Sequence, residues 1–345
     1  MYLPFQTRSG VVARRLGVLL VLVFSFISAG AAGSPLDRFA RLQDQDRRVA
    51  RVAYRLATAD RALCPMALTP QLGFVLHALD QYAPADRSAA AQRFGLGQQI
   101  GVMAVIDGSP AQQAGLVAGD QLVAINGRAL PAGMGGAART PSRARVDQVQ
   151  RLLVEEMQRG AVTLAVSGAR GARTLHFAPD YGCAASIELI PGTMTNAWAD
   201  GSRILIGAGL LQRCASDADL ALIIAHEMAH NLLRHRQRLA AFRAADDAGT
   251  PISAAELQQS RIAEEQADLW AVRLTAIAGY DMSGAAAFMA GLLGTAPTAV
   301  TTHPAAARRL ALLRAALAAQ GVGADGAGRG RIANTASSGL VSGRM

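Results

Sequence analysis

The stretch DADLALIIAHEMAHNLLRHR, residues 217–236, decides the fold of the C-terminal half of this chain. Its apolar residues occupy nearly all sides of a predicted helix, and a helix of that kind is buried. Within it stand His226, Glu227 and His230, whose polar groups are costly to bury unless something coordinates them. The pattern therefore predicts a buried helix that carries a metal site.

The spacing of these polar residues suits zinc chemistry. His226 and His230 are one helical turn apart, so both imidazoles project from one face at a separation suited to a single zinc ion. Glu227 lies about 100° round the helix, where it can act as a general base on water without being a ligand. The alternative is a chance HExxH on a surface helix, where these side chains are simply solvated.

A catalytic zinc ion takes three protein ligands and keeps one position open, so a third ligand is needed. Metzincins place it six residues after the second histidine, but that position is Arg236 here. His235 is one residue short and, on a continuous helix, points about 140° away from His230. We therefore interpret His235 as a surface residue or as a support for a ligand.

A second predicted helix, Arg261–Ile277, offers a downstream carboxylate. Glu264 and Asp268 lie one turn apart on one face, and the alanines beside them allow this helix to pack closely on the first. Spacing alone leaves open a different interpretation, in which Glu264, Glu265 and Asp268 form an exposed acidic face.

These motifs together resemble a known family. HEMAH at 226–230 and EEQAD at 264–268, with NAWADG at 196–201 before them and THP at 302–304 after, resemble the zinc peptidases typified by HtpX, BepA and the CAAX prenyl proteases. The resemblance covers roughly residues 183–318. It implies a mainly helical zincin-type domain with a small sheet and one Zn²⁺ ion per chain. The extra membrane spans of HtpX and the prenyl proteases are missing, so the soluble periplasmic branch is the better match.

The resemblance also implies roles for individual residues. It makes Glu264 the third zinc ligand beside His226 and His230, and it favours Glu264 over Glu265. It makes Asp268 a support for a ligand histidine.

The later His-Pro motif, with an arginine six positions on, matches His303 and Arg309. The resemblance implies that both stabilise the oxyanion of the reaction, or that His303 closes the open zinc position as a latch. The alternative is an ordinary helix start with a surface arginine. Upstream, the resemblance implies an edge strand that lines the cleft and pairs with extended substrate, formed by Asn196, Ala197, Trp198 and Ala199.

A second resemblance precedes the peptidase motifs. Residues 100–128 resemble a PDZ domain in their order of strand, GSPA turn, short helix, strand and Asn-Gly turn. Leu72, Gly73 and Phe74 resemble the PDZ loop whose backbone amides hold the terminal carboxylate of a peptide. The alternative for Gly73 is an ordinary turn glycine, and residues 146–157 are expected to form the second PDZ helix.

Cys64 and Cys183 bracket the PDZ-like module, and the ends of a domain often lie close together. We therefore expect them to form a disulfide. Cys214 is then the remaining thiol, and we expect it to be buried.

The N-terminal segment reads as an export signal. Arginines precede the apolar run Leu16–Ile27, and small residues follow it, which is the order of a secretory signal. An uncleaved anchor spanning residues 11–32 is the alternative. We expect the protein to be periplasmic or secreted, with membrane contact only through an uncleaved N-terminus.

Together, these motifs and segments predict an α+β protein in five parts. They are a signal peptide or anchor at 1–33, an amphipathic helix at 34–64, a β-rich PDZ domain at 65–180, a zinc metallopeptidase domain at 181–319 and a disordered tail at 320–345.

Composition excludes two other functional classes. All 34 basic residues are arginines, so a phosphate-binding P-loop, which needs a lysine, is absent. The arginines are scattered, and aromatic residues make up only 5% of the chain, so a nucleic-acid-binding surface is not expected.

The sequence thus predicts a zinc endopeptidase of the cell envelope that degrades unfolded or misassembled proteins. Its PDZ module is expected to recruit protein or peptide substrates, in particular a C-terminal peptide. The alternatives are a non-proteolytic chaperone or scaffold that works through the PDZ groove, and membrane-anchored processing of one partner.

Overall fold

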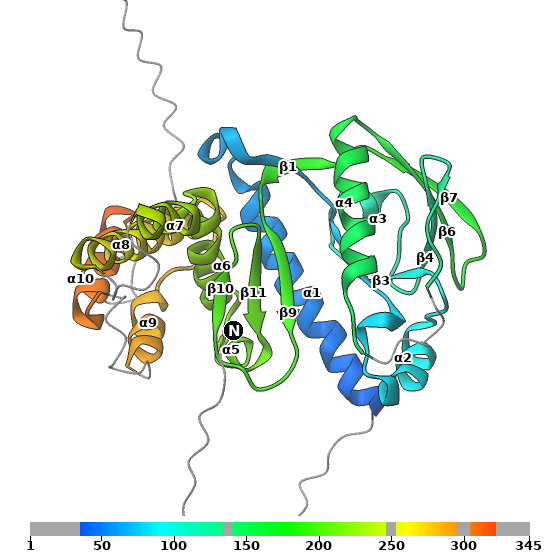
Figure 1. Cartoon of the computed structure of the whole chain (residues 1–345), viewed down its shortest axis with the longest axis horizontal. Helices are drawn as coiled ribbons and strands as arrows, with labels where there is room; N and C mark the ends of the chain where they lie inside the picture. The colour runs from blue at the N-terminus through cyan, green and yellow to red at the C-terminus, as the bar shows by residue number, and fades with distance from the viewer. Residues whose placement is uncertain (1–34, 134–139, 246–252, 295–303, 322–345) are drawn as a thin grey trace, which may run out of the picture.

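Figure 1 shows the computed structural model of the chain, which describes residues 35–133, 140–245, 253–294 and 304–321. Helices and short strands form two bodies joined by one long helix, which confirms the α+β class. The helices are α1 Pro35–Ala59, α2 Arg87–Phe94, α3 Pro110–Gln113, α4 Ala144–Gln158, α5 Ala208–Leu211, α6 Asp217–Leu232, α7 His235–Ala245, α8 Ala254–Ile277, α9 Ala285–Leu293 and α10 Ala306–Ala319. The strands are β1 Leu68–Gln71, β2 Phe74–His77, β3 Ile100–Val105, β4 Gln121–Ile125, β5 Arg128–Ala129, β6 Val162–Ser167, β7 Arg173–Phe177, β8 Asp180–Cys183, β9 Ser186–Ile190, β10 Ala197–Ala199 and β11 Arg203–Gly207.

Some expectations fall on other parts of the chain. The expected signal at 1–33 and His303 lie outside the described residues, as does most of the expected tail at 320–345. Within the part that is described, no helix combines the length and the apolar character that a membrane span requires.

Helix α1 packs against both bodies. Val49, Val52 and Leu56 are 0–2% exposed and lie in the core of the C-terminal body, because they share one face at helical spacing. One end of the helix places Phe39 against Tyr82 of the N-terminal body, with the rings edge to face at 5.4 Å. The helix therefore fixes the two bodies relative to each other.

The N-terminal body is an antiparallel sheet covered by α4. Its strand order is β2-β3-β4-β6-β7, with β5 paired to β4, so β2 is an edge strand. Along β6, buried residues that face the core alternate with partly exposed ones. The side of α4 that faces the core has buried residues at spacings of three and four, namely Val146, Val149, Leu153 and Met157. The expected second PDZ helix at 146–157 is therefore present as α4.

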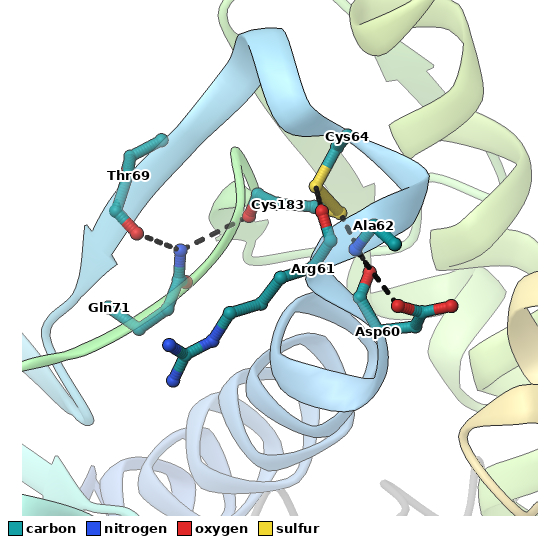
Figure 2. The surroundings of a disulfide bond; sticks show 7 residues. All are labelled: Asp60, Arg61, Ala62, Cys64, Thr69, Gln71 and Cys183. Atoms are coloured by element: carbon teal, nitrogen blue, oxygen red, sulfur yellow. Dashed lines mark hydrogen bonds between the residues drawn. A yellow bond between two sulfur atoms is a disulfide. The ribbon is translucent and has the colours of Figure 1, made fainter.

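A short two-stranded neck connects this body to the rest of the chain (Figure 2). Strand β1 leads in and β8 leads out, and they pair antiparallel with Leu68 opposite Cys183. The expected disulfide between Cys64 and Cys183 closes the neck, and the Gln71 side-chain amide donates to the Thr69 and Cys183 carbonyls at 3.1 Å. Cys214 is the free, buried thiol.

The C-terminal body combines a small sheet with the helices α6, α8 and α10. The sheet order is β10-β11-β9, with β9 parallel to β11 and β10 antiparallel to it, so β10 and β9 are both edges. Ala263, Ala267 and Ala271 of α8 are 0–5% exposed, and α8 packs against α6. Small side chains at these positions let the two helices approach closely, as the sequence predicts.

The start of α6 is held from two sides. Ser216 and Asp219 form a reciprocal capping box, with hydrogen bonds of 3.1 and 2.9 Å, which satisfies N–H groups that a helix start leaves unpaired. Asp217 in the same turn pairs with Arg48 at 2.8 Å and with Arg51 at 2.6 Å, both from α1. These contacts fix the beginning of the helix that carries the HExxH motif.

Candidate metal centre

Helix α6 brings the two motif histidines together. The Nε2 atoms of His226 and His230 lie 3.1 Å apart, because the residues are one turn apart on the face that meets α8. Both side chains are only 15–18% exposed. The exposed-helix alternative is therefore wrong.

Helix α8 supplies a carboxylate to the same point. The two oxygens of Glu264 lie 3.5 Å from the His226 Nε2 and 3.6 Å from the His230 Nε2. Ligand atoms around a tetrahedral zinc ion are roughly 3.3–3.5 Å apart for bonds of about 2.0–2.2 Å. The three side chains thus have a spacing that could hold a metal ion, and no backbone movement is needed to form it.

The neighbouring glutamate lies elsewhere. Glu265 forms an ion pair with Arg308 on the surface, and Glu264 is buried with 8% exposure. The exposed-acidic-face interpretation is therefore wrong for Glu264 and also for Asp268, which is 3% exposed.

Asp268 orients the first histidine. Its carboxylate accepts a hydrogen bond from the His226 Nδ1–H at 3.0 Å, which leaves the lone pair of Nε2 facing Glu264 and His230. Arg309 donates two hydrogen bonds to Asp268, at 2.8 and 2.6 Å. Burial raises the pKa of Asp268, but the hydrogen bonds from Arg309 and His226 outweigh it, so the pKa is lowered and Asp268 stays ionised.

Arg309 is occupied by carboxylates on two sides. Besides Asp268, it contacts Glu264 at 3.3 Å, and it is only 8% exposed. The surface-arginine alternative is therefore wrong. The contacts show Arg309 holding Asp268 and Glu264 in place, and its contact with an oxyanion stays a prediction.

His235 orients the second histidine, which agrees with its interpretation as a support for a ligand and excludes the surface interpretation. Its Nε2 lies 3.1 Å from Oε1 of Gln266, so that nitrogen carries the proton and donates it. Its Nδ1 lies 3.1 Å from Nδ1 of His230 and therefore accepts, so the His230 proton is on Nδ1 and the lone pair of Nε2 faces the cluster. Both histidine ligands thus have their tautomer set by a neighbour.

The expected direction of His235 is wrong for a physical reason. That direction assumes an uninterrupted helix, but α6 ends at Leu232 and Arg234 takes a left-handed backbone with φ of 54°. The helix is interrupted at that point, and His235 starts α7 with 2% exposure. A positive φ at an arginine has no signal in the sequence, because most such positions are glycine, asparagine or aspartate.

Changing His235 to alanine is expected to weaken metal binding about 10–100-fold, the usual effect of removing the hydrogen-bond partner of a ligand histidine. The glutamine variant is expected to retain most of the affinity, because its side-chain oxygen can still accept from His230. Competition with a chromophoric chelator measures the affinity. His176→Ala, an exposed histidine on β7, is the matched control. Equal affinity of the alanine variant and the unchanged protein contradicts this role.

Comparisons with known families agree with this geometry. The peptidase family M48 profile matches residues 182–248 and 247–317, and the PDZ domain profile matches residues 101–166. Residues 182–317 belong to peptidase family M48. The protein is thus a metallopeptidase with a PDZ domain, which confirms both resemblances. No curated protein matches the chain.

In the M48 domain, the motif glutamate lies between the three candidate metal ligands and the sheet. The carboxylate of Glu227 accepts a hydrogen bond from the backbone N–H of Ala199 on β10. The pKa of Glu227 is raised, mainly by burial and also by the charge of Glu264. The charge of His226 opposes this rise and does not cancel it. A carboxylate whose pKa lies above its usual range is a better proton acceptor near neutral pH.

The open edge of β10 adjoins Glu227. Ala197 and Ala199 lie opposite Ile206 and Ile204 of β11 without hydrogen bonds of their own to that strand. The bonds are made by the neighbouring residues: Gly207 N–H donates to the Asn196 carbonyl, and Asp200 N–H donates to the Arg203 carbonyl. In such pairs the N–H and C=O groups of the paired residue point away from the partner strand. Ala197 therefore presents both backbone groups at the open edge, where an extended peptide can pair.

The PDZ domain has a comparable open edge at β2. Gly73 takes a φ of +69°, and a Cβ there would lie 2.5 Å from the Cβ of Ser109, so the turn requires glycine. Phe74 pairs with Val105, but the hydrogen bond beside them runs from Ile106 N–H to the Gly73 carbonyl. The N–H of Phe74 therefore points to the open edge of β2.

Proposed function

We propose that this protein is a zinc-dependent endopeptidase of the periplasm or the extracellular space that degrades unfolded or misassembled proteins. The observation that carries the proposal is the convergence of three side chains, His226, His230 and Glu264, with Glu227 and an open strand edge beside them. Two nitrogens and one carboxylate are a donor set typical of catalytic zinc, and they leave a fourth position for water or substrate.

Zinc bound there would lower the pKa of a water molecule and polarise the scissile carbonyl. Glu227 would accept a proton from the attacking water and pass it to the leaving amine. Asp268 and His235 would hold His226 and His230 in the tautomers that bind the ion. His303 as an oxyanion donor or latch is part of the proposal from the family resemblance alone.

Substrate would lie along β10 as an added strand. Pairing at a strand edge uses backbone groups only, so it accepts many sequences but requires an extended, unfolded segment. Asn196, Ala197, Trp198 and Ala199 line this path. This requirement supports internal cleavage of unfolded chains rather than removal of terminal residues.

The PDZ domain would recruit substrate through its Leu72-Gly73-Phe74 loop, which suits the carboxylate of a C-terminal peptide. Export is supported by the N-terminal segment and by the disulfide, because disulfides persist in oxidising compartments.

The test is cleavage of reduced casein by the purified protein, with metal content measured in parallel. We expect one zinc ion per chain, loss of cleavage on treatment with a chelator, and recovery on adding one equivalent of zinc. Mass spectrometry of the products is expected to show internal cuts. Cleavage that survives complete removal of metal contradicts the proposal.

A further inference from the structure

The PDZ groove opens into a cleft between the two bodies. Figure 1 shows α1 passing between β9 of the M48 domain and α4 of the PDZ domain. Residues of all three elements, together with the carboxylate loop and β2, line a cleft of about 1040 Å³. A ligand in the PDZ groove therefore meets residues that an isolated PDZ domain does not have.

One residue of α1 stands out in this cleft. Asp46 lines it and is half-buried, and its carboxylate has no hydrogen-bond or ion-pair partner among the described residues. Burial raises the pKa of Asp46 to about 7, opposed by Arg143 and reinforced by the charge of Glu188. An unpaired carboxylate of this kind costs folding free energy, so a partner from outside would be bound favourably.

Arg143 and Arg203, two of the arginines that line the cleft, are already engaged. Arg143 pairs with Asp147 at 2.8 Å and with Glu188 at 3.4 Å, and Arg203 pairs with Glu188 at 3.1 Å. Neither arginine forms an ion pair with Asp46, and a cation supplied by a ligand could form one.

The position of Asp46 along the groove follows from β2. The carboxylate loop lies at the Phe74 end of the strand, and His77 at the other end bonds to the Tyr82 hydroxyl at 2.9 Å. Phe39 of α1 packs on Tyr82, and Tyr54 of the same helix lies beside Gly73 of the loop, so α1 runs along the groove. Asp46 precedes Tyr54 by eight residues, which places it about 12 Å along the helix from the loop toward the His77 end, or about the length of three to four strand residues.

A peptide whose terminal carboxylate sits at the loop would run antiparallel to β2 toward His77. We propose that this cleft binds C-terminal peptides that carry an arginine or lysine about three residues before the last, and that this side chain pairs with Asp46. The inference rests on the proposed peptide-binding role of the PDZ groove and deepens it to a ligand class. It also makes α1, which lies outside the PDZ fold, part of the specificity site.

Fluorescence anisotropy with labelled octapeptides tests this. All proteins carry Glu227→Gln so that the peptides stay intact. The peptides end in valine, to suit the apolar Leu72 and Phe74, and have arginine, alanine or glutamate at the fourth position from the end. The arginine peptide is expected to bind about tenfold more tightly than the alanine peptide, since a charge-assisted hydrogen bond contributes that much.

Asp46→Asn is expected to reduce this preference to less than about twofold while the alanine peptide still binds. Asp44→Asn, on the exposed side of the same helix, is the matched control and is expected to keep the preference. Thermal unfolding checks that both variants are folded.

The outcomes separate the two proposals. The peptides are also tested with an amide in place of the C-terminal carboxylate. If the amide abolishes binding but the arginine and alanine peptides bind equally well, the groove recognises a C-terminal carboxylate and the role of Asp46 is overturned. If no peptide binds, or the amide binds as well as the acid, the recruitment role and the Asp46 inference both fall.

Discussion

Replacing Glu227 with glutamine is expected to lower peptide hydrolysis about 10²–10⁴-fold, the usual contribution of a general base. Glutamine has the same shape, and its side-chain oxygen can still accept the hydrogen bond from Ala199, but it cannot take a proton. The variant is expected to bind zinc, because the ligand set of His226, His230 and Glu264 is untouched. Burial of Glu227 and the nearby charge of Glu264 raise its pKa, which is the property that the substitution removes.

The measurement is casein cleavage by the zinc-loaded variant beside the unchanged protein. Glu265→Gln is the matched control, because that glutamate pairs with Arg308 away from the metal cluster, and we expect it to keep full activity. Normal cleavage by Glu227→Gln contradicts the general-base role. If the unchanged protein binds zinc and also fails to cut, the chaperone or scaffold function is favoured, since a scaffold has no need for a base at this position.

Removing the disulfide is expected to have the largest effect on stability. Cys64 and Cys183 close a loop of 119 residues, and the chain-entropy relation gives about 5 kcal/mol for a loop of that length. The bond also secures the two-stranded neck where the PDZ domain joins the M48 core. The double serine variant is therefore expected to unfold at a midpoint lower by about 10 °C or more.

Thermal unfolding followed by circular dichroism measures this, with and without a reductant. Cys214→Ser is the matched control, because that thiol is free and its sulfur donates only to the Leu210 carbonyl. We expect a small shift for this control and no added effect of reductant on the double variant. A double variant as stable as the unchanged protein would falsify the stabilising role of the bond.

The candidate metal ligands on α6 were predictable because their positions depend only on the repeat of an α-helix. A spacing of four residues places His226 and His230 on the same face of any helix, whatever surrounds it. The apolar residues around them predicted burial, which the structure shows. The carboxylate from α8 was different: spacing allowed Glu264 or an exposed acidic face, and only the resemblance to a zinc peptidase family separated them.

The neighbours of the ligands could not be predicted in the same way. His235 contacts His230 because the helix is interrupted at Arg234, and a rule based on a continuous helix places it elsewhere. Arg309 lies 41 residues from Asp268 in sequence, and only the packing of α10 on α8 brings the two together.

The sequence by itself determined the chemistry that is local: the HExxH pair, the turn glycine at Gly73 and the pattern of strands and helices in each domain. Each follows from the periodicity of a helix or strand, or from the backbone conformation that a single residue must adopt. Only the tertiary structure decided what lies between domains. The unpaired Asp46 faces the PDZ groove because α1 packs against both bodies, and a side chain's neighbours across such a contact depend on how the bodies dock, which no local pattern records.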